Sequence, residues 1–243
     1  MEPLETEHLV AVGVTAALVA ASIRIARALP GDRTRAVSRG LALAILLAYA
    51  TDHAAAVARG DWSPDRYLPF HLTDAVTIVC AVALWAPRPL PVELAYFWAL
   101  TASLQAVLTP DLGQGFPDVY FWTYFVTHSG AVIAACMLVF GWQLQPRPGA
   151  VRRAVAATAA MTAAAAIANL ATGGNYMFLR EKPGAGSLLD LFGPWPVYIG
   201  VAAVLAVVLF AALDAPFRRA RRSPTGEQRG AVQRCVGHRG SHA

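Results

Sequence analysis

The sequence has little charge and almost no lysine. Charged residues make up 14% of the 243 residues, whereas a soluble domain usually carries about a quarter. The single lysine, Lys182, lies in a glycine-containing stretch and not in an apolar run, which excludes a retinal Schiff base on a membrane helix. With 56% hydrophobic residues and a mean hydropathy of +0.47, the charge deficit indicates a lipid-facing surface.

Cysteine is also scarce, and the three present have no CxxC spacing and no histidine pattern beside them. This excludes a disulfide framework and a zinc site. Cys80 and Cys136 fall in apolar runs and are predicted to be small buried hydrophobes, and Cys235 lies near the end of the chain. The GxSxG, HExxH and Walker A motifs are missing. The membrane histidines share one layer, which disfavours haem, so we expect no cofactor and no metal.

Seven apolar stretches are long enough to cross a bilayer, which takes roughly 20 residues. They predict an all-α, polytopic bundle of about seven transmembrane helices. The sixth stretch is nearly all alanine, and small residues at this density predict a helix packed inside the bundle. The predicted spans are 9–29, 40–58, 69–86, 90–109, 119–141, 151–171 and 195–216.

The orientation follows from the loops, since arginines flank cytoplasmic helix ends. Arginines alternate with acidic loops along the whole chain, which predicts an outer N-terminus, a cytoplasmic C-terminus and a multi-pass protein of the cell membrane. The acidic start is not typical of a signal peptide. The net charge of +5 reflects this topology, and no nucleic-acid partner is expected. We expect a transmembrane domain over 1–217 and a disordered basic tail over 218–243.

Polar side chains that are costly in lipid recur at one depth, which marks a candidate site. Five predicted helices bring them to the outer half of the membrane, while the inner halves are almost purely apolar. We therefore expect these side chains to surround one pocket. They are Asp52, His53, His71, Thr73, Asp74, Gln105, His128 and Asn169.

The fifth span carries a polar stripe at i, i+3, i+4, i+7 and i+8, which is one face of a helix. In a membrane helix such a face points into the bundle or a water-filled cavity. The alternative is ordinary hydrogen bonding between helices, worth around 1 kcal/mol per contact. The stripe consists of Tyr120, Thr123, Tyr124, Thr127 and His128.

At the start of the third span, His71 and Asp74 share a face, so the carboxylate could orient the imidazole. Thr73 points elsewhere and pairs with Thr77. A threonine in a helix usually bonds its own i−4 carbonyl, so spacing alone does not mark Thr73 as a nucleophile. Adjacent helix positions do not face each other, which leaves the pairing of Asp52 with His53 open.

The longest loop, 172–194, mixes aromatic, apolar and turn-forming residues. A double glycine, Gly173–Gly174, permits a sharp turn back toward the membrane. The loop could fold as a lid that brings Asn175 and Tyr176 to the pocket, or it could be an ordinary interfacial loop.

Three runs, LPFHLTDAVTIVC, FPDVYFWTYFVTHSGAVI and NYMFLREKPGAGSLLDLFGPWPVYI, resemble the YwaF-type bacterial integral membrane family. The resemblance covers about residues 40–215. That family is similar to a eukaryotic transmembrane acyltransferase that makes ether phospholipids and, more distantly, to the androgen-induced-gene-1 type lipid hydrolases. These relatives use a Thr or Cys nucleophile on one membrane helix and a His on another.

The resemblance implies that Thr73 in HLTD is the nucleophile and His128 in THSG is the base. It implies acyl-ester chemistry on membrane lipids, either hydrolysis or acyl transfer. We expect Asn169, Asn175 or Gln105 to bind the oxyanion. A different reading is a transporter or binding protein for a small polar or amphipathic ligand with a His/Asp proton relay, and a third is a structural subunit. Transporters often contain an internal repeat, and this sequence shows none, which favours the enzyme. The oligomeric state stays open.

Overall fold

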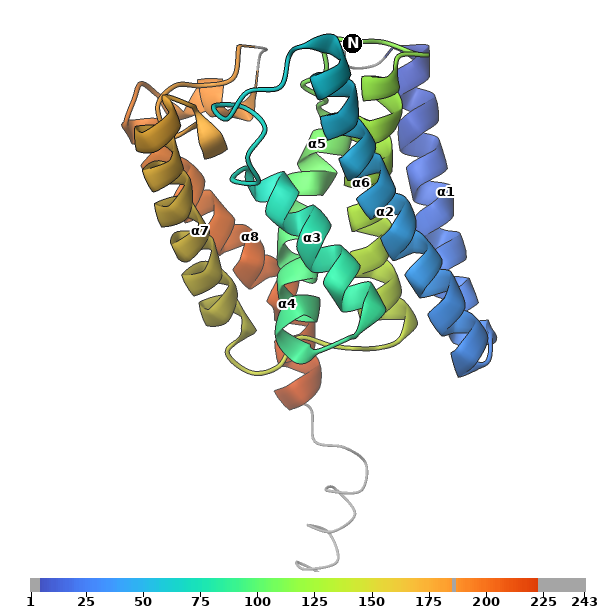
Figure 1. Ribbon diagram of the computed structural model, residues 1–243. Helices are drawn as coiled ribbons and strands as arrows, with labels where there is room; N and C mark the ends of the chain where they lie inside the picture. Colours follow the sequence, from blue (N-terminus) through green and yellow to red (C-terminus); the bar gives the residue numbers. More distant parts are fainter. Residues whose placement is uncertain (1–4, 185–186, 223–243) are drawn as a thin grey trace, which may run out of the picture.

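The computed structural model describes residues 5–184 and 187–222, and in these residues all regular structure is helical (Figure 1). Most helices run along one axis and form a bundle. The first described residues and α5 lie at one end of this bundle, and the arginine-rich last turns of α8 lie at the other. In chain order the elements are α1 (Thr6–Ala28), α2 (Gly31–Arg59), α3 (Leu72–Trp85), α4 (Pro89–Trp98), η1 (Ala99–Ser103), α5 (Leu104–Leu108), α6 (Val119–Cys136), η2 (Met137–Gly141), α7 (Ala150–Thr172), η3 (Tyr176–Phe178), η4 (Leu188–Phe192) and α8 (Val197–Arg222).

Five helical stretches in the described part of the chain are long and apolar enough to cross a membrane. They are Thr6–Ala28, Gly31–Arg59, Val119–Gly141, Ala150–Thr172 and Val197–Arg221. The third predicted span corresponds to α3, which is shorter, and the fourth to α4, η1 and α5, where a π-helical turn interrupts the α-helix.

Several helices begin or end at residues other than the limits of the predicted spans. The second helix already begins at Gly31, directly after its N-cap residue Pro30, which has an extended ψ of 152° and no N–H with which to continue the preceding helix. α3 begins at Leu72 and not at 69. α8 continues past Pro216 to Arg222, so the first residues of the expected tail are helical, whereas 223–243 and Cys235 lie outside the described residues.

The core lies in the half of the bundle away from the N-terminus, where α2, α3, α4 and α6 meet. α6 is the central helix, and most of its length is buried. Gly130 lets α2 approach it closely, since a Cβ atom there would lie 2.6 Å from Cγ1 of Ile45. Cys80 and Cys136 are buried with free thiols in this core, as predicted.

The alanine-rich helix was expected inside the bundle, and that prediction was wrong. α7 stands at the edge beside α8 (Figure 1), and most of its residues are not buried. The physical reason is that alanine is as compatible with lipid as with a neighbouring helix. Composition therefore does not decide which of the two it faces.

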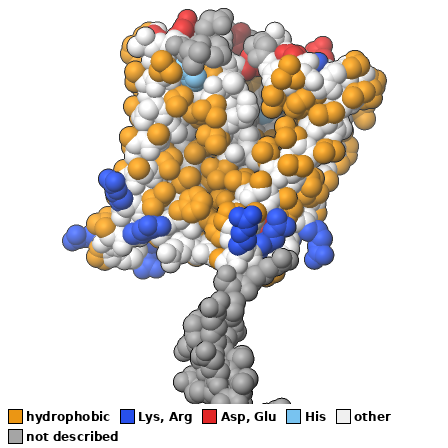
Figure 2. Space-filling view, turned by 180° about the vertical axis from the view of Figure 1, so that it is seen from behind, with side chains coloured by type: hydrophobic (Ala, Val, Ile, Leu, Met, Phe, Trp, Pro, Cys, Tyr) orange, Lys and Arg blue, Asp and Glu red, His pale blue; other side chains and the backbone are white. Residues whose placement is uncertain are grey.

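Charge is segregated along the bundle axis. Figure 2 shows most of the basic side chains of this face at the end where α8 finishes, the acidic ones at the other end, and a largely apolar surface between them. At the basic end Glu93 is 2% exposed and binds Arg147 and Arg153, each with a shortest N–O distance of 2.8 Å. This cluster ties α4 to the start of α7.

Candidate active site

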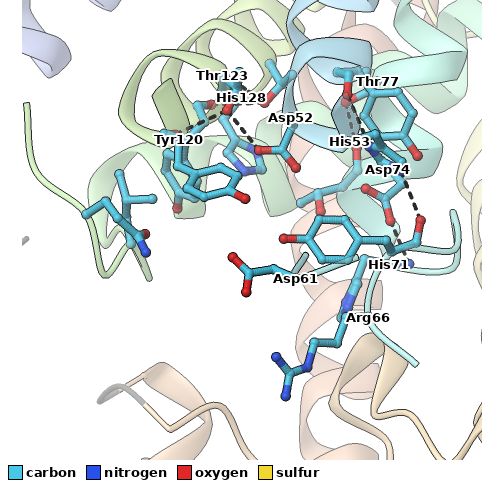
Figure 3. Close-up of a pocket in the computed structure, with 17 residues that line it drawn as sticks. Asp52, His53, Asp61, Arg66, His71, Asp74, Thr77, Tyr120, Thr123 and His128 are labelled. Atoms are coloured by element: carbon cyan, nitrogen blue, oxygen red, sulfur yellow. Dashed lines mark hydrogen bonds between the residues drawn. The ribbon is translucent and has the colours of Figure 1, made fainter. Parts of the chain in front are cut away.

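A polar cavity of about 520 Å³ opens at the acidic end of the bundle, among α2, α3, α6 and the loop between α2 and α3 (Figure 3). Its lining is rich in histidine, aspartate, threonine and tyrosine, whereas the hydrophobic core lies in the opposite half of the bundle. The lining residues are Tyr49, Asp52, His53, Asp61, Arg66, Tyr67, His71, Thr73, Asp74, Thr77, Leu112, Gln114, Tyr120, Thr123, Tyr124, Thr127 and His128.

The polar stripe of α6 faces this cavity along its whole length. All five of its members, from Tyr120 to His128, are lining residues, as the helical spacing predicted. Asp52 connects the stripe to α2, because its Oδ1 accepts a hydrogen bond of 2.9 Å from the Thr123 hydroxyl. The four residues that were expected around one pocket all line this cavity: Asp52, His53, Thr73 and His128.

Thr73 lies in the first turn of α3, which changes what its hydroxyl can do. A threonine further along a helix would bond its i−4 carbonyl, and Thr77 does so, donating to the Thr73 carbonyl at 2.9 Å. Among the described residues the Thr73 hydroxyl has no such partner, and the side chain is half-buried at the cavity wall. Its oxygen is therefore available to a ligand.

His128 lies deeper in the stripe, and its ring packs edge-on against Tyr124 with ring centroids 4.3 Å apart. The Tyr124 hydroxyl donates to the Ala106 carbonyl at 2.9 Å, which holds that ring in place. Within the described part of the chain, neither nitrogen of His128 hydrogen-bonds to protein. The imidazole is oriented by packing, and its nitrogens stay available in the cavity.

His53 connects α2 to the loop that follows it. Its Nδ1 lies 3.1 Å from the Tyr49 carbonyl oxygen and its Nε2 lies 3.0 Å from that of Tyr67. A neutral imidazole can donate to only one of these oxygens, and an imidazolium can donate to both. His53 and Asp52 do not bond each other, because each has found a partner on another element.

The prediction that Asp74 orients the His71 imidazole was wrong. Asp74 Oδ2 instead accepts the backbone N–H of His71 at 3.1 Å, closing the first turn of α3. The His71 ring is held from elsewhere: its Nδ1 accepts the backbone N–H of Met177 at 3.3 Å. The Asp74 carboxylate, three residues after the N-cap residue, therefore binds a free backbone N–H at the start of the helix and not the imidazole.

Four predicted pocket residues do not line the cavity: Gln105, Asn169, Asn175 and Tyr176. Gln105 is exposed and donates to the Thr109 hydroxyl on its own helix turn. Both ends of the Asn169 amide bind the backbone of Tyr176, and the Asn175 amide bonds within its own loop to Arg180 and Glu181. The depth predicted for these residues therefore did not determine the direction in which their side chains point.

The loop after α7 contacts the wall of the site without lining it. Tyr176 is fully buried; its hydroxyl donates to the Pro64 carbonyl at 2.6 Å and accepts from the Leu68 amide at 3.0 Å. Its ring meets His71 edge-on at 5.1 Å. The expected lid is thus a buttress: the segment closes onto the loop between α2 and α3, behind the cavity.

Sequence reasoning missed several lining residues. Tyr49 precedes Asp52 and His53 at the same i, i+3, i+4 spacing that marked the α6 stripe, so this signal was present. Asp61, Arg66 and Tyr67 belong to a loop that looked like an ordinary connector, as did the stretch containing Leu112 and Gln114. No local pattern distinguished these loops.

The rim of the cavity carries an ion pair between α2 and α6. Arg59 binds Asp118 at 3.0 Å and lies over the Tyr120 ring at 4.6 Å. The Tyr120 backbone N–H, at 2.9 Å, and the Arg59 guanidinium hold the pKa of the Asp118 carboxyl below its usual range. The carboxylate therefore caps α6 and fixes the helix that carries the stripe.

Comparison with known proteins places the chain in a family. The profile of the TMEM164 family matches residues 3–214, nearly all of the chain. No curated protein and no solved structure matches. The match and the apolar helices together identify a membrane protein. The chain belongs to the TMEM164 family.

Proposed function

We propose that this protein is a membrane-embedded enzyme of lipid acyl-ester chemistry, a hydrolase or acyltransferase, with Thr73 as nucleophile and His128 as base. The observation that carries the proposal is that both side chains, one from α3 and one from α6, line the same cavity, and that among the described residues neither the Thr73 hydroxyl nor the His128 imidazole has a hydrogen-bond partner. A threonine hydroxyl needs an adjacent base to become a nucleophile, and a neutral imidazole is suited to that task.

The chemistry balances with these two groups. Thr73 Oγ1 attacks the ester carbonyl carbon as His128 takes the hydroxyl proton, and the tetrahedral intermediate collapses with cleavage of the ester C–O bond. His128 returns the proton to the leaving alcohol. The acyl-threonine then passes its acyl group to water, which gives hydrolysis, or to the hydroxyl of another lipid, which gives transfer.

The membrane setting belongs to the same proposal. We take the chain to be a multi-pass protein of the cell membrane with seven spans, an outer N-terminus and a cytoplasmic C-terminus. Two features support this: the helical stretches α3 and α4 to α5 fill the remaining predicted spans, and basic and acidic side chains segregate to opposite ends (Figure 2). The cavity then opens at the outer surface, and the substrates are membrane lipids, consistent with the resemblance to the YwaF-type and acyltransferase families.

Purified protein in lipid nanodiscs tests the proposal. We expect Thr73→Ala and His128→Ala each to abolish turnover of a phospholipid or fluorogenic ester, and the double variant to be scarcely slower than either single one. Thr73→Cys should retain activity, because a thiol needs less activation. Thr162→Ala, which loses only a hydroxyl bond within α7, is the matched control and should match the wild type. Undiminished turnover by Thr73→Ala would exclude this mechanism.

One observation favours a second function. Three aspartates (Asp52, Asp61 and Asp74), three histidines and Arg66 line the same cavity, a composition that suits a proton-coupled transporter or binding protein for a small polar ligand. In that case Thr73→Ala and Thr73→Cys would behave alike in transport, and no covalent probe would label position 73.

A further inference from the structure

An enzyme of the proposed kind needs a donor for the oxyanion that forms when the carbonyl is attacked. The three amide side chains that the sequence offered for this role, on Gln105, Asn169 and Asn175, are bonded to other parts of the protein. The donor must therefore be another group near Thr73 at the cavity wall.

His71 lies two residues before Thr73 along the chain and lines the same cavity, and its hydrogen-bond partner fixes which ring nitrogen carries the proton. The Met177 backbone N–H, which can only donate, points at Nδ1 at 3.3 Å, so Nδ1 accepts. A neutral imidazole has one proton, and that proton is therefore on Nε2. Among the described residues Nε2 has no hydrogen-bond partner, and it is not sealed from solvent.

The surrounding structure is arranged to hold this contact. Met177 and Phe178 both have φ of +54°, a left-handed conformation that costs about 1–2 kcal/mol per non-glycine residue. Asn169 stabilises it by binding the N–H and the carbonyl of Tyr176, at 2.6 and 3.1 Å. The rings of Tyr176 and Phe178 pack on His71 at 5.1 and 5.7 Å. Strain maintained this way points to a role at a site.

We propose that His71 is a catalytic hydrogen-bond donor, whose Nε2–H binds the carbonyl oxygen of the ester that Thr73 attacks. This rests on the proposed function. The two histidines then have different roles: His128 moves the proton, whereas His71 keeps its proton and stabilises the negative charge that develops on oxygen. When the intermediate collapses, the ester C–O bond breaks and the carbonyl re-forms with the hydrogen bond still in place.

The tautomer can be measured without any substrate. Protein labelled with 15N-histidine gives imidazole nitrogen resonances by NMR, and the signal missing in His71→Phe assigns residue 71. We expect an unprotonated Nδ1 and a protonated Nε2 near neutral pH. A protonated Nδ1 in the wild type would overturn the proposal.

Kinetics test the role itself. His71→Phe keeps a ring against Tyr176 but has no donor, and we expect kcat to fall about 10²–10³-fold with little change in KM. His71→Gln keeps an N–H donor of similar reach and should restore part of kcat. Phe70→Leu, which alters another ring that contacts Tyr176, is the matched control and should stay near wild type. If the His71 ring acted only by packing, His71→Phe would have a higher kcat than His71→Gln, and that result would refute the proposal.

The outcome separates this inference from the function on which it rests. Full activity in His71→Phe, together with inactive Thr73→Ala, would overturn the donor role and leave the proposed enzyme intact. Full activity in Thr73→Ala would overturn the enzyme mechanism, and the donor role with it.

Discussion

The Tyr176 hydroxyl provides a sharp test of how the loop after α7 supports the site. Tyr176→Phe removes one oxygen and leaves the ring against His71. The lost oxygen donates to the Pro64 carbonyl at 2.6 Å and accepts from the Leu68 amide at 3.0 Å, from a side chain with no exposed surface. Both backbone groups belong to the loop that forms part of the cavity wall.

The magnitude follows from these two bonds. Each contributes about 1 kcal/mol net, and more when its partner is left buried without a bond, so we expect a loss of about 2–3 kcal/mol. Since 1.4 kcal/mol is a factor of ten, the loop should open about 30- to 140-fold more often. The bonds hold one loop, so the effect is a local opening and not unfolding of the bundle.

Hydrogen exchange measured by mass spectrometry on peptides containing Leu68 reads this opening directly. We expect faster exchange there in Tyr176→Phe and unchanged exchange in the core of α6. Tyr96→Phe is the matched control, because it also loses a buried tyrosine hydroxyl bond, to the Leu213 carbonyl at 3.1 Å, but at the other end of the bundle. Equal protection of Leu68 in the wild type and Tyr176→Phe would refute the buttress role.

Three other predictions concern packing, charge and topology. Gly130→Ala places a Cβ 2.6 Å from Ile45 Cγ1; we expect a cost of about 1–3 kcal/mol, seen as a lower Tm in detergent, and an unchanged Tm would mean that α2 can move away. Glu93→Gln removes the charge that binds two arginines from a side chain 2% exposed, and should cost about 2–3 kcal/mol; no change in Tm at low salt would show that this cluster does not stabilise the fold. A reporter fused after residue 217 should be active only in the cytoplasm and one in 110–118 only outside, and the reverse pattern would invert the orientation.

The sequence by itself determined the class of protein and much of the site. A low charge content and long apolar stretches predict membrane helices, because polar backbone in lipid must be bonded within the helix. The helical repeat placed Tyr120 to His128 on one face, and depth in the predicted spans placed Asp52 and Thr73 at the same level. These inferences succeed because they depend on spacing along one helix and on position along the bundle axis.

Tertiary structure decided everything that depends on which way a helix is turned toward its neighbours. The position of a residue along its predicted span could not show that Asn169 binds Tyr176, that α7 lies at the edge of the bundle, or that Asp74 closes a helix turn. The partner of His71 lies 106 residues away on a loop, and no local pattern specifies such a contact. A periodic sequence defines the face of a helix, but the direction of that face is set by packing with elements distant in the chain.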